Sequence, residues 1–185
     1  MHEIIPAILP KGEKDMEEKI AALPPEITLI HFDVLEKDIW VPIPQDFEVH
    51  LMVENPETQF AKWIERGAKR ISCHTVVPEL AQYRGQAEIG LAVELDKPLD
   101  AVIPFVSFVD FIHLMSIDEI GAQGHPLDER IFARLTELQA KFPNVPIAVD
   151  GGVNKNNYQK LLELGADRLV VGSGFKELWE TLKTT

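Results

Sequence analysis

The sequence has very little cysteine and no long apolar run. Its 185 residues include a single cysteine, Cys73, which lies in an apolar stretch. One cysteine cannot form a disulfide framework, so we expect a buried thiol and a location in the reducing cytoplasm. No apolar run approaches the roughly 20 residues that span a membrane. The first residues also lack the charged and apolar segments of a signal peptide.

Positive charge is scarce as well. The chain has 18 Lys and Arg against 30 Asp and Glu, a net charge of −12. Nucleic acids and anionic membranes attract clustered Lys and Arg, so we expect neither as a partner. An anionic substrate would instead need backbone N–H groups, helix N-termini or a metal ion.

The remaining composition is that of an ordinary globular protein. Hydrophobic residues make up 45% of the chain and charged residues 26%. Both values are typical of soluble domains, and the length suits one domain over residues 1–185. Short apolar runs recur along it and are typical of buried parallel strands. We predict strands at residues 4–9, 28–34, 47–53, 70–74, 89–94, 111–115, 145–150 and 168–172.

Helical patterns lie between many of these runs. Amphipathic spacing and capping residues predict helices at residues 14–23, 56–66, 127–141, 154–164 and 175–182. Gly67 and Gly165 follow two of them as expected C-caps. Strands alternating with helices predict right-handed βαβ units and a parallel sheet.

Eight such strands predict a (β/α)₈ or TIM barrel, although these barrels usually exceed about 200 residues. The shortfall lies in two places. Pro42 and Pro44 argue against a helix between the second and third strands, and only residues 78–84 offer a short one after the fourth. We therefore predict a barrel in which helix 2 is missing and helix 4 is shortened. An open doubly wound sheet is the alternative.

Three predicted strands end in residues that bind metals. His31 and Asp33 are two residues apart, so their side chains share one face of a strand. His50 and Asp150 lie at or near the ends of two other strands. All four can meet at the C-terminal rim of a barrel and enclose one divalent ion. Two His and two carboxylates suit Zn, Fe, Mn or Co.

This set of residues predicts a particular chemistry. A divalent ion on the oxygens of an α-hydroxyketone stabilises an enediolate. One carboxylate can remove a proton from carbon while the other returns one from the opposite face. The outcome is inversion at the carbon beside a carbonyl.

Glycines near the chain's end suggest a phosphate site. Gly151 and Gly152 follow one strand, and Gly172, Ser173 and Gly174 follow the next, each before an expected helix. The loops after strands seven and eight of a barrel frequently bind phosphate through backbone N–H groups. A third glycine-bearing loop occupies residues 121–124.

Six motifs together resemble the ribulose-phosphate 3-epimerase family. They lie at residues 5–9, 31–34, 49–56, 115–116, 149–154 and 171–173, in the family's order and over nearly the whole chain. The resemblance implies a ribulose-phosphate-binding barrel with one divalent metal on His31, Asp33, His50 and Asp150, of which Asp33 and Asp150 are the acid/base pair. It also implies contacts with substrate and phosphate by His50, Met52, Gly121, Gly151, Gly152, Gly172 and Ser173.

The sequence departs from the family in its loops. Ala7 stands where the family has Ser, and Leu35 stands where it has a Met that lines the metal site. The loop after the sixth strand contains Asp118 and Glu119, which would repel a phosphate unless they point away. The metal-binding positions are thus retained while the substrate loops diverge.

We therefore predict a metal-dependent isomerase that epimerises a ketose phosphate at C3. The expected reaction converts D-ribulose 5-phosphate to D-xylulose 5-phosphate, a step of the pentose phosphate pathway, or acts on a related sugar phosphate. The alternative is a non-catalytic protein that binds a metal or a phosphate ligand. A decarboxylase or aldolase would need Asp-x-Lys-x-x-Asp, but Lys37 lies four residues after Asp33. A purely structural barrel would bind no metal.

The other histidines and the surface give weaker indications. His74, at the end of the fourth strand, is a candidate for contact with the metal ligands from behind. His113 lies inside an apolar strand, which favours a structural role. The trimmed helices would expose apolar surface, so a homo-oligomer is open, with Ile39 and Trp40 as candidate contacts.

Overall fold

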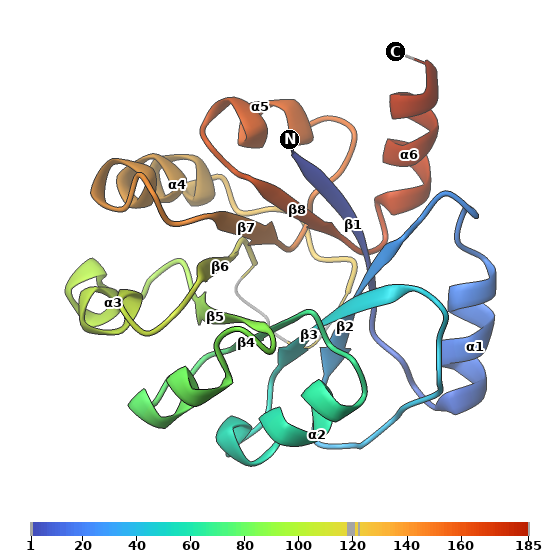
Figure 1. Cartoon of the computed structure of the whole chain (residues 1–185). Helices are drawn as coiled ribbons and strands as arrows, with labels where there is room; N and C mark the ends of the chain where they lie inside the picture. The colour runs from blue at the N-terminus through green and yellow to red at the C-terminus, as the bar shows by residue number, and fades with distance from the viewer. Residues whose placement is uncertain (1, 118–120, 122, 185) are drawn as a thin grey trace.

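Eight parallel strands close into a barrel in chain order, with β8 paired to β1 (Figure 1). The computed structural model describes residues 2–117, 121 and 123–184. The strands are β1 (Glu3–Ile8), β2 (Leu29–Val34), β3 (Asp46–Leu51), β4 (Arg70–Cys73), β5 (Glu88–Val93), β6 (Phe111–Met115), β7 (Ile147–Asp150) and β8 (Arg168–Val171). The predicted TIM barrel is confirmed, and the open sheet is excluded.

Helices surround the barrel on its outside (Figure 1). They are α1 (Glu13–Ala21), α2 (Phe60–Glu65), α3 (Leu99–Val106), α4 (Arg130–Lys141), α5 (Tyr158–Glu163) and α6 (Phe175–Thr184), with short 3₁₀ helices η1 (Pro56–Thr58) and η2 (Pro78–Tyr83). Gly67 and Gly165 have φ of 100° and 101° after α2 and α5, as expected of C-caps. None of the helices in the described part of the chain is long and apolar enough to cross a membrane.

The helix α3, to which the sequence analysis assigns no residues, contains Pro104. A proline removes the hydrogen bond to the carbonyl four residues earlier. Here that carbonyl belongs to Asp100, an exposed residue in the first turn of a helix of 8 residues. The helix therefore loses little by accepting the proline.

Residues 35–45, which connect β2 to β3, form no helix. The side chain of Trp40 partly covers the space beside these two strands. The ring of Trp40 lies 4.8 Å from Phe47 and 5.5 Å from Trp63, measured between centroids. Phe47 belongs to β3 and Trp63 to α2, so Trp40 packs against both elements. A cavity of about 560 Å³ remains between this segment and α1. It is lined mostly by apolar side chains, including Met16, Phe32 and Leu35.

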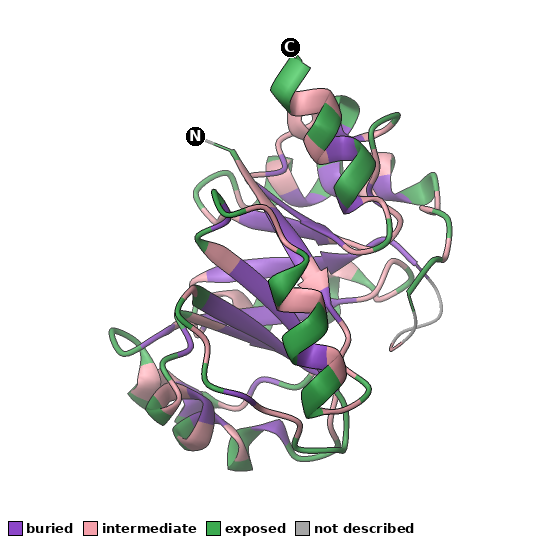
Figure 2. Ribbon diagram, turned by 90° about the vertical axis from the view of Figure 1, so that its right-hand side faces the viewer, coloured by how far each residue is buried: buried purple, intermediate pink, exposed green. Residues whose placement is uncertain are grey.

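Each strand presents an apolar face outward and, at several positions, a polar face inward. On β2, Ile30, Phe32 and Val34 are buried on one face, while His31 and Asp33 alternate with them on the other. Figure 2 shows the strands buried along most of their length, with exposed residues concentrated on helices and loops. The interiors of such barrels are usually filled by bulky branched side chains, so the polar interior needs its own explanation.

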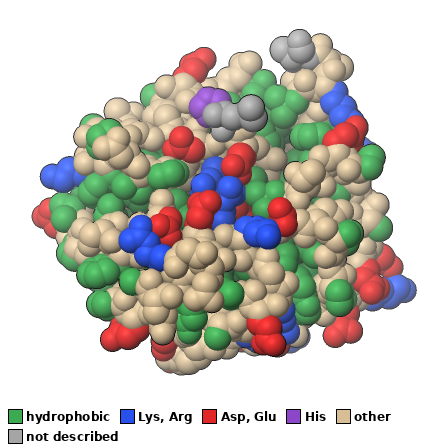
Figure 3. Space-filling view, in the orientation of Figure 1, with side chains coloured by type: hydrophobic (Ala, Val, Ile, Leu, Met, Phe, Trp, Pro, Cys, Tyr) green, Lys and Arg blue, Asp and Glu red, His purple; other side chains and the backbone are tan. Residues whose placement is uncertain are grey.

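The N-terminal end of the interior holds a network of ion pairs. Arg70 lies 2.7 Å from Glu3, 3.0 Å from Glu48 and 3.5 Å from Glu88, measured between side-chain nitrogen and oxygen. Arg168 lies 2.7 Å from Glu88. In Figure 3, which views the end of the barrel where the N-terminus lies, acidic and basic side chains gather at the centre. We call these five residues the basal ion-pair network.

Candidate active site

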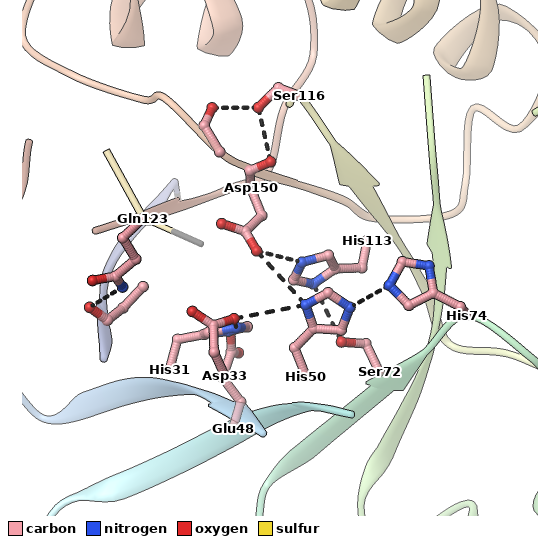
Figure 4. Close-up of polar contacts among 12 residues, drawn as sticks. His31, Asp33, Glu48, His50, Ser72, His74, His113, Ser116, Gln123 and Asp150 are labelled. Carbon is pink, nitrogen blue, oxygen red and sulfur yellow. Dashed lines mark hydrogen bonds and ion pairs between the residues drawn. The ribbon is translucent and has the colours of Figure 1, made fainter. Parts of the chain in front are cut away.

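The four residues predicted to bind metal meet at the other end of the barrel interior (Figure 4). The register pairs Asp33 on β2 with His50 on β3, and Asp150 ends β7. His50 Nδ1 lies 3.8 Å from Asp33 Oδ1 and 3.8 Å from Asp150 Oδ2. His31 Nε2 lies 3.5 Å from Asp33 Oδ1. Four side chains from three strands therefore converge on one small volume.

Two ring nitrogens in this volume have no hydrogen-bond partner. His31 Nε2 and His50 Nδ1 are both buried, and neither makes a hydrogen bond with a described residue, although each faces a carboxylate at 3.5–3.8 Å. Leaving a buried polar atom unpaired costs about 1–3 kcal/mol. The cost is removed if both nitrogens bind a cation, for which His31 gives up its proton on Nε2. The donor set, two imidazoles beside two carboxylates, fits a divalent ion of the Zn, Fe, Mn or Co type.

The opposite nitrogen of each ring is held in place. His31 Nδ1 lies 2.7 Å from Glu48 Oε1. His50 Nε2 lies 2.9 Å from His74 Nε2, and His74 Nδ1 lies 2.6 Å from Glu94 Oε1. Metal-binding histidines usually donate their second N–H in this way, which fixes the tautomer and the ring orientation. His74 thus contacts a predicted ligand from behind, as its sequence position suggested.

The two aspartates differ in acidity. Burial alone would raise the pKa of Asp33, but the adjacent His31 and His50 rings outweigh it and lower that pKa below the ordinary value. Burial raises the pKa of Asp150, and the negative charge of Asp33 raises it further. One carboxyl group therefore favours the charged form and the other more readily holds a proton. Such a divergence is typical of an acid/base pair.

The histidines differ in charge as well. Burial opposes protonation of His31, but Asp33 and Glu48 prevail and raise its pKa to about 10. Burial, and electrostatic repulsion from the nearby His113 and His74 rings, lower the pKa of His50 to about 4. Without a metal, the His31 imidazolium partly neutralises the carboxylates, which is the task a divalent cation would perform.

His113 is the residue that the sequence did not assign to the site. Its Nε2 lies 3.0 Å from Asp150 Oδ2, and its Nδ1 lies 3.3 Å from Ser72 Oγ. One ligand atom from each of His31, His50, His113 and Asp150 lies within 4.8 Å of the others. One sequence signal pointed to it: His113 is the single polar residue of a predicted apolar strand. A buried imidazole needs a hydrogen-bond partner.

A cavity of about 260 Å³ opens beside Asp33 and Asp150. Six of the seven predicted substrate-contact residues line it, namely Met52, Gly121, Gly151, Gly152, Gly172 and Ser173. The seventh, His50, is fully buried beside the cavity and is absent from its lining. Among the described residues, no Lys or Arg lines it, so backbone groups must supply most of the attraction for an anion.

The loops after β7 and β8 form one wall of this cavity. Gly151 and Gly152 have φ of 114° and 63°. A Cβ on Gly152 would lie 2.2 Å from the backbone nitrogen of Leu127. A Cβ on Gly174 would lie 2.6 Å from the carbonyl oxygen of Val153, so the two loops pack directly together. Only glycine allows this close packing of backbone beside a ligand.

The loop after β6 reaches across the cavity towards β1. Gln123 Nε2 donates to the carbonyl oxygen of Ala7 at 3.3 Å, and both residues line the cavity. Gln123 also lies beside Gly172, where a Cβ would approach its amide to 3.2 Å. Asp118 and Glu119 lie outside the described residues.

The chain was compared with known proteins. A model of the ribulose-phosphate 3-epimerase family matches residues 3–176. The ribulose-phosphate 3-epimerase of Mycoplasma genitalium is 32% identical over 180 residues, covering 85% of this chain and 84% of the relative. That of Aquifex aeolicus is 29% identical over 175 residues, covering 79% and 76%.

Solved structures agree with the fold. Tryptophan synthase of Mycobacterium tuberculosis matches with a TM-score of 0.68 and 15% identity, covering 97% of this chain and 86% of that one. This likeness concerns the fold alone. The family match covers nearly the whole chain and confirms the resemblance of the six motifs, so the chain belongs to the ribulose-phosphate 3-epimerase family.

Proposed function

We propose that this protein is a metal-dependent epimerase that inverts C3 of a ketose phosphate. The substrate we expect is D-ribulose 5-phosphate, converted to D-xylulose 5-phosphate, or a related sugar phosphate. The observation that supports it most is the pair of unpartnered nitrogens on His31 and His50 beside two carboxylates that line one cavity. Membership of the epimerase family supports the same chemistry.

The residues that would hold the metal are His31, Asp33, His50 and Asp150. A divalent ion there supplies Lewis-acid stabilisation for negative charge on the substrate's oxygens. Glu48 and His74 keep the two rings oriented for it. The ion would also replace the charge that the His31 imidazolium supplies in its absence.

Asp33 and Asp150 would move the protons. Asp33, the stronger acid of the two, is charged and removes the proton from C3. Asp150, whose pKa is raised by burial, delivers a proton to the opposite face of the same carbon. After one turnover Asp33 holds a proton and Asp150 has lost one, so the pair acts on the product in reverse. Exchange of these protons with solvent labels the substrate carbon.

The phosphate would lie against the loops after β7 and β8. Gly152, Gly172 and Ser173 line the cavity, and their backbone N–H groups are the natural donors. Because no described Lys or Arg lines the cavity, these donors and the metal must offset the repulsion from a chain with a net charge of −12. Gln123 closes this side by its bond to Ala7.

Solvent exchange followed by NMR tests the proposal. The protein is loaded in turn with Fe²⁺, Mn²⁺, Co²⁺ or Zn²⁺ and mixed in D₂O with ribulose 5-phosphate and related ketose phosphates. We expect deuterium at C3 together with the epimer for at least one metal and one sugar. Tight metal binding without exchange on any sugar would overturn epimerisation and favour a binding protein instead.

A further inference from the structure

A third histidine faces the volume in which the metal would bind. His113 is fully buried on β6, and its ring centroid lies 4.5 Å from that of His50 and 5.4 Å from that of His31. In Figure 4 its ring points towards Asp150, beside the ring of His50. We propose that His113 Nε2 is an additional metal ligand, so that the ion is bound by three imidazoles. This inference rests on the metal site of the proposed function.

Distances between donor atoms support this assignment. His113 Nε2 lies 3.0 Å from Asp150 Oδ2. Two ligands at right angles on an ion, each about 2.1 Å from it, are separated by about 3.0 Å. The two atoms therefore already have the separation of neighbouring ligands on one ion, which would lie to one side of the line between them and replace their hydrogen bond.

The complete set of donors needs only a small contraction. Ligand atoms of His31, His50, His113 and Asp150 lie within 4.8 Å of one another. Atoms bound to the same ion at about 2.2 Å are at most about 4.4 Å apart. The most widely separated pair would therefore have to close by about 0.4 Å to lie on opposite sides of one ion. Asp33 is outside this set, although its Oδ1 lies 3.5 Å from His31 Nε2.

The second ring nitrogen of His113 also has a hydrogen-bond partner. Its Nδ1 lies 3.3 Å from Ser72 Oγ. When an ion replaces the hydrogen bond between Nε2 and Asp150, the ring proton lies on Nδ1 and can be donated to this hydroxyl. Three neutral nitrogen donors favour Zn²⁺ or Co²⁺ over Mn²⁺.

The number of bound imidazoles can be counted by paramagnetic NMR of the Co²⁺-loaded protein. Each coordinated ring keeps one N–H, and each of these has an acceptor among the buried side chains. For His31 the acceptor is Glu48, for His50 it is His74, and for His113 it is Ser72. We expect three exchangeable, hyperfine-shifted N–H signals in the wild-type protein. Two signals would overturn the inference.

Variants separate a ligand from a residue that only positions Asp150. His113→Gln retains an amide N–H that can bond to Asp150 but loses the imidazole. We expect one N–H signal to vanish and the affinity for Zn²⁺ to fall by more than about 10-fold, the lower range for loss of a supporting group. His2→Gln, at an exposed histidine just before β1, should keep all three signals. Unchanged Zn²⁺ affinity in His113→Gln would contradict the inference.

These outcomes are distinct from those of the proposed function. Two N–H signals with turnover intact would remove His113 from the metal site and leave the epimerase proposal standing. No binding of Co²⁺ or Zn²⁺ at all would overturn both the metal site and this inference. The wild-type count needs no variant to fold, so it decides the question by itself.

Discussion

The two ends of the barrel interior are both polar, but they differ in how their charged and polar side chains are paired. In the basal ion-pair network, Arg70 and Arg168 face Glu3, Glu48 and Glu88, so each cation has at least one carboxylate within 3.0 Å. At the catalytic end, the neighbouring side chains leave two buried nitrogens unbonded. Both guanidinium groups of the base are ion-paired within the chain, although Arg168 Nη1 has no hydrogen-bond partner among the described residues, whereas at the other end the proposed metal would take up the two free nitrogens.

Glu48 joins the two ends. Its Oε2 lies 3.0 Å from Arg70, and its Oε1 lies 2.7 Å from His31 Nδ1. Burial would raise the pKa of Glu48, yet His31 and Arg70 together lower it to about 2. The same carboxylate therefore stabilises the base and orients a predicted metal ligand. Substitutions at the base should alter stability, those at the catalytic end should alter turnover, and Glu48 should alter both.

The largest effect is expected at the catalytic end. Asp33→Asn and Asp150→Asn should each lower the epimerisation rate by about 10²–10⁴-fold, the usual contribution of a general acid or base. Neither change should prevent folding, because it removes one of two like charges in a buried site. NMR in D₂O measures the rate and circular dichroism measures the fold.

A matched control lies five residues from Asp33. Asp38 is half exposed and pairs with Arg66 at 2.6 Å, outside the cavity beside Asp150. Asp38→Asn should leave the rate unchanged. Full activity in either Asp33→Asn or Asp150→Asn would remove that residue from the acid/base pair.

The next largest effect is expected at the base. Arg70→Met removes the cation shared by three carboxylates and leaves Glu48 without it. Breaking a buried ion pair in this way costs about 3–5 kcal/mol of unfolding free energy. Urea denaturation measures the loss, while the Zn²⁺ stoichiometry of the folded variant should stay at one.

Arg84→Met is the control for this change. Arg84 pairs with Asp110 at 2.6 Å but its side chain is 43% exposed. Exposed ion pairs contribute about 0–1 kcal/mol, so this variant should remain close to wild type. Equal losses of unfolding free energy in Arg70→Met and Arg84→Met would show that the basal ion-pair network stabilises the protein no more than an exposed ion pair does.

Glu48→Gln tests the junction between the two ends. The amide can still contact His31 Nδ1, but it carries no charge to pair with Arg70 or to polarise the ring. Loss of such an outer partner typically lowers metal affinity by about 10–100-fold. Isothermal titration with Zn²⁺ measures this, and urea denaturation should show a separate loss of stability. A change in only one of the two quantities would mean that Glu48 serves one end alone.

The sequence predicted the residues that meet at the strand ends well, because two physical rules, side-chain alternation and closure of the barrel, decide where they lie. Period-two alternation placed His31 and Asp33 on one face, and the barrel brought them to His50 and Asp150. His113 was not assigned to the site because the residues that it contacts, Ser72 on β4 and Asp150 on β7, lie far from it in the sequence. No single strand reveals which side chain stands opposite it across a barrel.

The elements outside the barrel were predicted less completely, for local reasons. No residues were assigned to a helix between the fifth and sixth strands, where α3 accommodates Pro104 because the carbonyl it leaves unbonded is that of the exposed Asp100. In residues 35–45 the prolines did indicate the absence of a helix, but not that Trp40 would cover β3 there. Tertiary packing, rather than local preference, decided both segments.

The smallest effect is expected at Ser72, which pairs in register with His50. Its hydroxyl lies 3.3 Å from His113 Nδ1, which is long for a hydrogen bond. The contact orients the ring but stabilises it only weakly. A hydrogen bond of this kind contributes about 0.5–1.5 kcal/mol, so Ser72→Ala should lower Zn²⁺ affinity by about 10-fold or less. Isothermal titration beside Glu48→Gln gives the ranking. If Ser72→Ala lost more affinity than Glu48→Gln, His113 would be held more firmly than His31, and the charged junction would not be the main support of the metal site.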